Sequence, residues 1–312
     1  MTQIFSEEFL KLDNLGIVDQ IKNKGFFKYD NAFSQEFINN VRNDVKTAGL
    51  SLNTNNVAGV FFTHGNQFFL THMLAVSLYF FRYCTNDKII DCCRNIFGKE
   101  FRLKALRYYE NFGGGVMQWH TDNRLYESKN SDGTHTVSPG IIFLAYLSDV
   151  NDGEFQYISG SHIWSGKNTY HDYSQEFVEK NYSKEVISFK GKAGTILIYN
   201  SWGVHRAKPT KNKSFVRKTL FFQVEKDIEH SEPILIKSEF LPDKVGEELK
   251  MYLGFGKKAD LSVYPKTNIF TMPMNTTVSL IILRWIISRL VLYLPGFIRK
   301  FLRKKLDIPT NK

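Results

Sequence analysis

Six short segments between residues 101 and 225 constrain the fold more than any other feature of this sequence. Each is rich in β-branched and aromatic residues and is bounded by turn-forming residues; they cover 101–112, 139–147, 153–158, 185–189, 194–200 and 215–225. A parallel sheet would need a long crossover in each connection, and no long helical pattern separates these segments. The pattern therefore predicts a sandwich or barrel of antiparallel strands.

The first hundred residues show a different, mainly helical pattern. Apolar side chains at helical spacing predict helices at 34–45, 66–84 and 86–97. Ser34 is placed to cap the first of these helices, and Gly98 is placed to end the last. His64 and His72 lie in this region without a suitably spaced ionisable neighbour, so we interpret both as structural.

The composition is that of a globular protein. The chain has 312 residues, of which 43% are hydrophobic, 23% charged and 15% aromatic. These values exclude disordered, collagen-like and low-complexity classes. A chain of this length forms one large domain or two moderate ones with a sizeable core, and its aromatic content favours packing on strands.

The excess positive charge is concentrated at the C-terminus. The formal net charge is +10, yet residues 284–312 hold eight basic side chains against Asp307 and so carry +7. The preceding 283 residues therefore carry only +3. This argues against the broad basic surface that nucleic-acid binding requires, and we expect no nucleic-acid partner.

The cysteines and the N-terminus predict a cytoplasmic protein. Cys84, Cys92 and Cys93 are too few for a disulfide framework, and the two adjacent residues are poorly placed to pair with each other. The first fifteen residues contain acidic side chains where a secretory signal has a basic start and an apolar run. We therefore expect a reducing compartment.

The first candidate for chemistry is the tripeptide His120-Thr121-Asp122. Residues two apart in a strand share a face, so this imidazole and carboxylate can bind one cation together. A third, remote histidine would complete the two-histidine, one-carboxylate set of non-haem iron. The 8 histidines and 31 acidic residues of the chain predict about 0.8 such pairs by chance, and a second one, His230-Ser231-Glu232, is present.

The sequence around each pair favours the first. His120 follows a β-rich segment and a glycine turn, whereas His230 has no histidine after it and lies in a polar, proline-containing stretch typical of a surface loop. The remaining choices for the third ligand are His135, His162, His171 and His205. His205 comes just after an apolar strand pattern and a Trp-Gly turn.

The strand after His205 contains a cation of interest. Strand alternation turns Arg217 to one face with neighbouring aromatic residues and Lys218 to the other. An inward guanidinium needs an anionic partner, and the distal carboxylate of 2-oxoglutarate is suitable because arginine binds carboxylates through a two-donor fork. The alternative is an exposed arginine beside an exposed lysine.

Taken together, these motifs resemble the phytanoyl-CoA dioxygenase family. The resemblance rests on His120-x-Asp122, on QYISGSHIW at 156–164, on WGVHRAKP with His205, and on Arg217 twelve residues further on. The stretch GFFKYDNAFSQEFINNV at 25–41 also resembles the opening strand and first helix of that family. The similarity spans roughly residues 15–225.

The resemblance implies a mainly β, α+β fold, in which N-terminal helices pack on a double-stranded β-helix, the cupin-like jelly roll. It also implies that His120, Asp122 and His205 hold Fe(II), that Arg217 binds 2-oxoglutarate, and that His162 is not a metal ligand. Two residues next to the triad are candidates for the pocket. Gln118 is expected to contact the cofactors, and Trp119 is either a pocket or a core residue.

The implied activity is that of a dioxygenase, which uses O2 to hydroxylate a substrate and forms succinate and CO2 from 2-oxoglutarate. Halogenating relatives have a small residue where this chain has Asp122, so hydroxylation is the expected outcome. The substrate is expected to be a small or lipid-linked molecule, because fold alone does not fix it. The alternative is a non-catalytic, membrane-associated β-barrel protein with a structural or vestigial metal site.

We expect a catalytic domain at 1–275, helical over 1–100 with a β-helix core at about 101–226, followed by a basic amphipathic tail at 276–312. Arg284 and Arg289 interrupt the apolar run of this tail, and each would cost about 2.5 to 3.5 kcal/mol at the centre of a spanning helix. A helix on the anionic inner face of a membrane fits better. Packing on the body or on a second subunit is the alternative.

Overall fold

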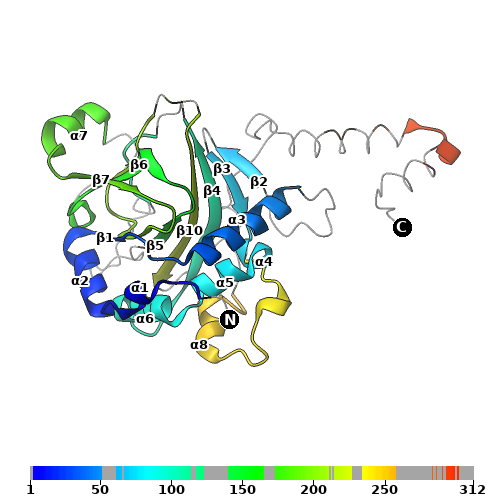
Figure 1. The fold of residues 1–312 in the computed structure, drawn as a ribbon, viewed down its shortest axis with the longest axis horizontal. Coiled ribbons are helices and arrows are strands. Elements are labelled where there is room, and N and C mark those ends of the chain that lie inside the picture. Colours follow the sequence, from blue (N-terminus) through cyan, green and yellow to red (C-terminus); the bar gives the residue numbers. More distant parts are fainter. Residues whose placement is uncertain are drawn as a thin grey trace, which may run out of the picture.

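We describe the chain from a computed structural model, shown in Figure 1. The structure describes residues 3–50, 61–64, 67–113, 117–122, 140–164, 173–210, 212, 214–226 and 234–257 of the body. In the C-terminal region it describes residues 283, 286, 290, 293–298 and 301.

Helices dominate the N-terminal part and return at two later points. They are α1 (Glu7–Lys11), α2 (Asn14–Lys24), α3 (Gln35–Leu50), α4 (Met73–Val76), α5 (Leu78–Cys84), α6 (Asp87–Phe97), α7 (Gln175–Tyr182) and α8 (Glu247–Tyr252). Short 3-10 turns occur at Ser161–Ile163 (η2) and Ser238–Phe240 (η3). The predicted stop is confirmed, because Gly98 ends α6 with a φ of 83° that few other residues adopt.

Two antiparallel sheets form the β core. The larger one has the strand order β1-β8-β5-β10-β4-β3-β2, and the smaller one has the order β7-β6-β9. Their strands are β1 (Phe26–Tyr29), β2 (Phe61–His64), β3 (Gln67–Thr71), β4 (Phe101–Phe112), β5 (Ile141–Tyr146), β6 (Val150–Ile158), β7 (Val186–Gly191), β8 (Ile196–Asn200), β9 (His205–Ala207) and β10 (Val216–Lys226). This arrangement confirms the predicted jelly roll.

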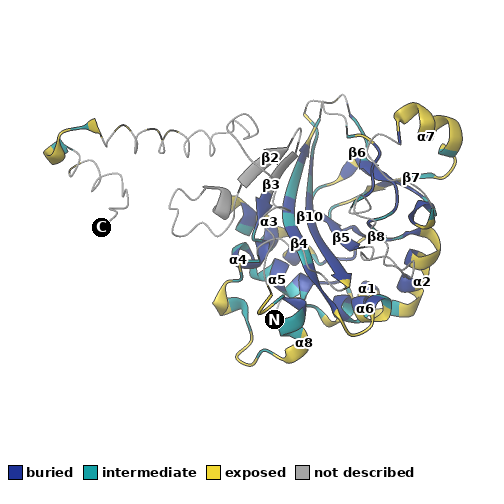
Figure 2. Cartoon of the chain, turned by 180° about the vertical axis from the view of Figure 1, so that it is seen from behind, coloured by how far each residue is buried: buried dark blue, intermediate teal, exposed yellow. Residues whose placement is uncertain are grey.

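The hydrophobic core has a large part on each face of the larger sheet. One face packs against the N-terminal helices, where Phe222 of β10 contacts Tyr83 of α5. The other face meets the smaller sheet, where Phe155 of β6 packs on Tyr199 of β8. Figure 2 shows the central strands β4, β5 and β10 as mostly buried. The space between the two sheets is therefore walled by buried aromatic side chains.

The observed elements confirm the β pattern read from the sequence and correct part of the helical one. All six predicted segments contain a strand. The helix predicted at 66–84 is wrong in its first part, because residues 67–71 form β3. This segment pairs with β4 along its whole length, and that tertiary pairing overrides the helical spacing of its apolar side chains. Helical structure begins only with α4.

The described part of the C-terminal region presents apolar side chains to solvent. They are Leu283, Ile286, Leu290, Tyr293, Phe297 and Phe301, with exposed fractions between 41% and 87%. Figure 1 shows the described segment at 293–298 apart from the two-sheet body. Within the described residues, no helix has the length and apolar character needed to cross a bilayer.

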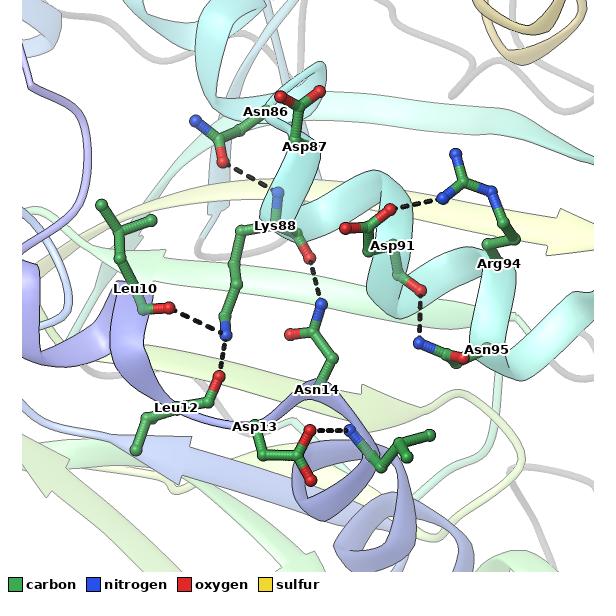
Figure 3. Close-up of a pocket in the computed structure, with 11 residues that line it drawn as sticks. Leu10, Leu12, Asp13, Asn14, Asn86, Asp87, Lys88, Asp91, Arg94 and Asn95 are labelled. Carbon is green, nitrogen blue, oxygen red and sulfur yellow. Dashed lines mark hydrogen bonds and ion pairs between the residues drawn. The ribbon is translucent and has the colours of Figure 1, made fainter.

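A shallow hollow lies on the helical side of the molecule, between the start of α2 and α6 (Figure 3). The Lys88 ammonium donates to the carbonyl oxygens of Leu10 and Leu12, and Asn14 donates to the carbonyl of Lys88. These bonds tie the α1–α2 connection to α6. The hollow contains none of the predicted site residues, so we interpret it as structural.

Candidate metal centre

The two histidines of the predicted triad meet across a short backbone bridge. The His120 amide donates to the His205 carbonyl at 3.0 Å, and the His205 amide donates to the His120 carbonyl at 2.8 Å. His205 begins β9, and the amide of Asp122 donates to the Ser201 carbonyl just beyond β8. Two loops that are eighty residues apart in sequence thus place three candidate ligands together.

The side chains of His120, Asp122 and His205 converge. The Nε2 atoms of His120 and His205 lie 3.8 and 3.5 Å from the two Asp122 carboxylate oxygens. One ligand atom from each residue lies within 4.8 Å of the others. Both histidines are buried, whereas 28% of the Asp122 side chain is exposed. Two imidazoles and one carboxylate on a partly open face form the donor set that suits non-haem iron.

Backbone carbonyls fix the orientation of both imidazole rings. The Nδ1 atom of His120 lies 2.8 Å from the Gln118 carbonyl oxygen, and the Nδ1 atom of His205 lies 2.9 Å from the Gly203 carbonyl oxygen. A carbonyl accepts only, so each Nδ1 must carry the proton of the neutral ring. Each Nε2 then faces the Asp122 carboxylate, and it is the nitrogen available to a cation bound between the three side chains.

The electrostatics of the triad also suit a cation. Burial and the neighbouring His205 lower the pKa of His120 to about 4, so its ring is neutral near pH 7. Burial alone would raise the pKa of Asp122, but His205, His120 and Arg107 together lower it to about 2. His120 therefore presents a neutral nitrogen donor, and Asp122 presents an anionic oxygen donor.

Arg217 lies on β10, and its charge and that of Asp122 both act on the buried Tyr199 of β8. It is 4% exposed, whereas the side chain of Lys218 is 44% exposed and lies 3.6 Å from Glu110. The predicted alternation of this strand is thus confirmed. The Arg217 guanidinium donates to the Gly153 carbonyl at 2.8 Å and to Asn111 Oδ1 at 3.1 Å.

The guanidinium of Arg217 keeps capacity for an anion. Its buried Nε has no hydrogen-bond partner among the described residues, and both groups that accept from it are neutral. Burial lowers its pKa, while Tyr146, Tyr199 and Glu154 act in the opposite direction. A buried cation held only by neutral acceptors is suited to a carboxylate ligand.

Aromatic rings cover the buried side of His205. The ring centroids of Phe155 and Tyr199 lie 5.4 and 5.1 Å from that of His205, and Tyr157 stacks nearly parallel at 6.4 Å. These rings come from β6 and β8, on opposite walls of the interior. They exclude water from one side of the triad, which strengthens its electrostatic interactions.

The other residues singled out in the sequence lie apart from the triad or outside the described residues. The His162 ring bonds to the Lys22 carbonyl at 2.9 Å and packs at Gly25, in agreement with its exclusion from the ligand set. Trp119 is 1% exposed and belongs to a core cluster on the outer face of the smaller sheet. The side chain of Gln118 is exposed, so only its carbonyl is placed at the triad. His135, His171 and the pair at 230–232 lie outside the described residues.

Three inward-facing residues of β4 join the site without having been predicted. Arg107 donates to the Tyr109 hydroxyl at 3.1 Å and helps to lower the pKa of Asp122, and Asn111 accepts from Arg217. The alternation of FRLKALRYYENF contained this signal. The role of these residues could be recognised only from the pairing of β4 with β10, which sets Asn111 beside Arg217.

Comparison with known protein families gives a match to phytanoyl-CoA dioxygenase (PhyH) over residues 22–219, well over half of the chain. A search of curated protein sequences gives no significant match.

Solved structures share the fold. HygX from Streptomyces hygroscopicus, with nickel, 2-oxoglutarate and hygromycin B bound, is 18% identical with a TM-score of 0.52, and the match covers 70% of this chain and 90% of HygX. The alpha-ketoglutarate-dependent carbocyclase SnoK from nogalamycin biosynthesis is 12% identical with a TM-score of 0.53, and the match covers 70% of this chain and 85% of SnoK.

The family match and the shared fold agree with the His120, Asp122 and His205 geometry. The chain therefore belongs to the phytanoyl-CoA dioxygenase family, and with it to the oxygenases that depend on iron and 2-oxoglutarate.

Proposed function

We propose that this enzyme hydroxylates a small or lipid-linked substrate, with His120, Asp122 and His205 as ligands of Fe(II) and with Arg217 binding 2-oxoglutarate. Succinate and CO2 are the coproducts in this proposal. The observation that supports it is a convergent His-Asp-His set together with a buried guanidinium whose charge, like that of Asp122, acts on Tyr199 of β8.

The residues of the chain have distinct tasks in this scheme. The Gln118 and Gly203 carbonyls accept from Nδ1 of each imidazole, which leaves each Nε2 as the nitrogen that would bind the metal. Asp122 supplies the single negative charge. A metal held by these two imidazoles and one carboxylate would keep open positions for further ligands.

Arg217 orients the cosubstrate. Its bonds to Gly153 and Asn111 fix the plane of the guanidinium, and the Nε–H, which has no partner among the described residues, would be available to the distal carboxylate. Phe155 and Tyr199 keep water from this side of the centre. When bound, the metal would activate O2, which is the oxidant, and 2-oxoglutarate would supply two of the electrons as it is converted to succinate and CO2; the protein side chains lack this chemistry.

We further propose that the tail at 276–312 binds an anionic membrane surface. Its described apolar side chains include Tyr293 at 87% and Phe297 at 77% exposure, which is costly for side chains meant to stay in water. Eight basic residues lie in the same segment. Apolar burial at the lipid boundary together with attraction to anionic headgroups is the usual basis of peripheral binding.

Formation of succinate from 2-oxoglutarate tests the enzymatic proposal. The purified protein should form succinate with Fe(II) and not after chelation, and Asp122→Ala should abolish this turnover while retaining the fold. A metal-loaded wild-type protein that leaves 2-oxoglutarate unchanged would favour the alternative of a non-catalytic barrel with a vestigial site.

A further inference from the structure

A polar network whose inner members, Arg206, Trp119 and Gln156, are buried lies on the face of the smaller sheet that points away from the triad. Neighbouring residues in a strand point to opposite faces, so Arg206 projects outward where His205 projects inward. Trp119 stands in the same relation to His120. The two residues are 8% and 1% exposed, and they belong to the layer between the smaller sheet and α7.

Arg206 and Trp119 contact each other directly. The Arg206 guanidinium carbon lies 4.2 Å from the centre of the Trp119 ring, which is a cation–π contact. This contact spans the gap between the two loops that carry the candidate ligands. It therefore joins the residue after one histidine to the residue before the other.

Two glutamines complete the network. Arg206 Nε donates to Gln156 Oε1 of β6 at 2.9 Å, and Arg206 Nη1 donates to Gln175 Oε1 at the start of α7. The Trp119 indole N–H donates to the same Gln175 oxygen at 3.3 Å. Gln156 is itself held by Ser188 of β7 at 2.8 Å. Gln156 and Gln175 thus hold the edge of the planar Arg206 guanidinium, while its face lies over the Trp119 ring.

The network lies where few backbone hydrogen bonds connect the His120 and His205 segments of the described structure. His120 and His205 are joined by an isolated bridge, and the described segment around His120 is not part of a strand. Beyond the bridge, the Asp122 amide bond to Ser201 and the contact of the Ala207 amide with Met117 Sδ hold the two loops together. In the part of the chain that the structure describes, few backbone hydrogen bonds therefore fix the spacing of the two histidines.

We propose that Arg206 is a positioning residue of the metal centre, which holds the His120 and His205 segments at metal-binding distance by clamping Trp119. The inference rests on the proposed function, since it assumes that these histidines bind the metal. Arg206 itself contacts neither the metal ligands' nitrogen atoms nor Arg217 in the described hydrogen bonds. Its loss should weaken metal binding and leave the contribution of Arg217 to 2-oxoglutarate binding in place.

Titration of the metal-free protein with Co(II) alone provides the test, because the visible spectrum of Co(II) reports both binding and ligand geometry. Arg206→Gln should weaken Co(II) binding by about 10- to 100-fold, as loss of groups that orient metal ligands typically does, and should alter the spectrum at saturation. Arg206→Lys keeps a cation over the ring but loses the fork, so it should recover part of the affinity. Gln175→Ala removes the shared acceptor at an exposed helix end and should weaken binding without unfolding the body.

Lys190→Ala is the matched control, since it removes a cation from the exposed part of the same sheet face without touching Trp119. It should bind Co(II) like the wild type. Unchanged affinity and spectrum in both Arg206→Gln and Gln175→Ala would overturn the inference, as would losses that only follow the thermal stability of the metal-free variants. If wild type and Asp122→Ala bind Co(II) equally, the proposed ligand set fails instead.

Discussion

Replacement of Arg217 by alanine should weaken 2-oxoglutarate binding far more than any nearby surface change. The guanidinium is 4% exposed and is the cation that we assign to the distal carboxylate. Truncating one partner of a buried, hydrogen-bonded charge pair costs about 2 to 5 kcal/mol. At 1.4 kcal/mol per tenfold, this corresponds to a loss of roughly 30-fold to several thousand-fold in affinity.

The assay is calorimetric titration of the Ni(II)-loaded protein with 2-oxoglutarate, which measures binding without turnover. Arg217→Lys should lie between wild type and Arg217→Ala, because it keeps a positive charge but not the two-donor fork. Ni(II) content should be unchanged in both variants, since Arg217 is not one of the three metal ligands.

Lys218→Ala is the control for this prediction. Lys218 is adjacent in sequence, but its side chain is 44% exposed and its ion pair with Glu110, at 3.6 Å, is of the surface kind that contributes at most about 1 kcal/mol. Its 2-oxoglutarate affinity should match the wild type. A large loss in Lys218→Ala together with a normal titration for Arg217→Ala would refute the assignment of the cosubstrate carboxylate to Arg217.

Three further predictions follow from the site and the tail. Asn111→Ala should raise the KM for 2-oxoglutarate less than Arg217→Ala does, since Asn111 only orients the Arg217 guanidinium. A loss of metal content in Asn111→Ala would instead show that Asn111 supports the metal centre. The pKa of His120 is lowered from 6.5 to about 4 in the folded state, so folding loses stability as pH falls through this window. Denaturant titrations of the metal-free protein should show this slope, and it should flatten in His120→Gln. Deletion of 276–312 should move the protein from anionic vesicles to the supernatant with succinate formation intact, and high salt should partly release the full chain; an untruncated protein that ignores the vesicles at low salt would show that the tail packs on protein.

The fold was largely legible in the sequence because its β segments are short, apolar and separated by turn residues. What was missed needed information from outside the segment. β9 has three residues, too few to show alternation, and α7 lies in a region without strong apolar spacing. Residues 67–71 become a strand because β4 offers them a partner, and no local pattern contains that information.

Site residues that lie close together in the sequence could be predicted from their spacing. Site residues that come together only through the register of paired strands could not. His120-x-Asp122 share a face by strand geometry, and Arg217 and Lys218 alternate in a run of aromatic residues. The association with His205 came from resemblance, since spacing alone left four histidines open. Arg206 could not be recognised because a basic residue after a candidate ligand has no signature; only its stacking on Trp119 reveals it.

The most direct test of the central claim is the iron content of purified variants after anaerobic loading with Fe(II) and desalting. Wild type should retain one Fe(II) per chain, and His120→Ala, Asp122→Ala and His205→Ala should retain little. His162→Gln and His230→Gln should retain as much iron as the wild type. Full iron content in any of the three triad variants, or its loss in His162→Gln or His230→Gln, would contradict the proposed metal centre.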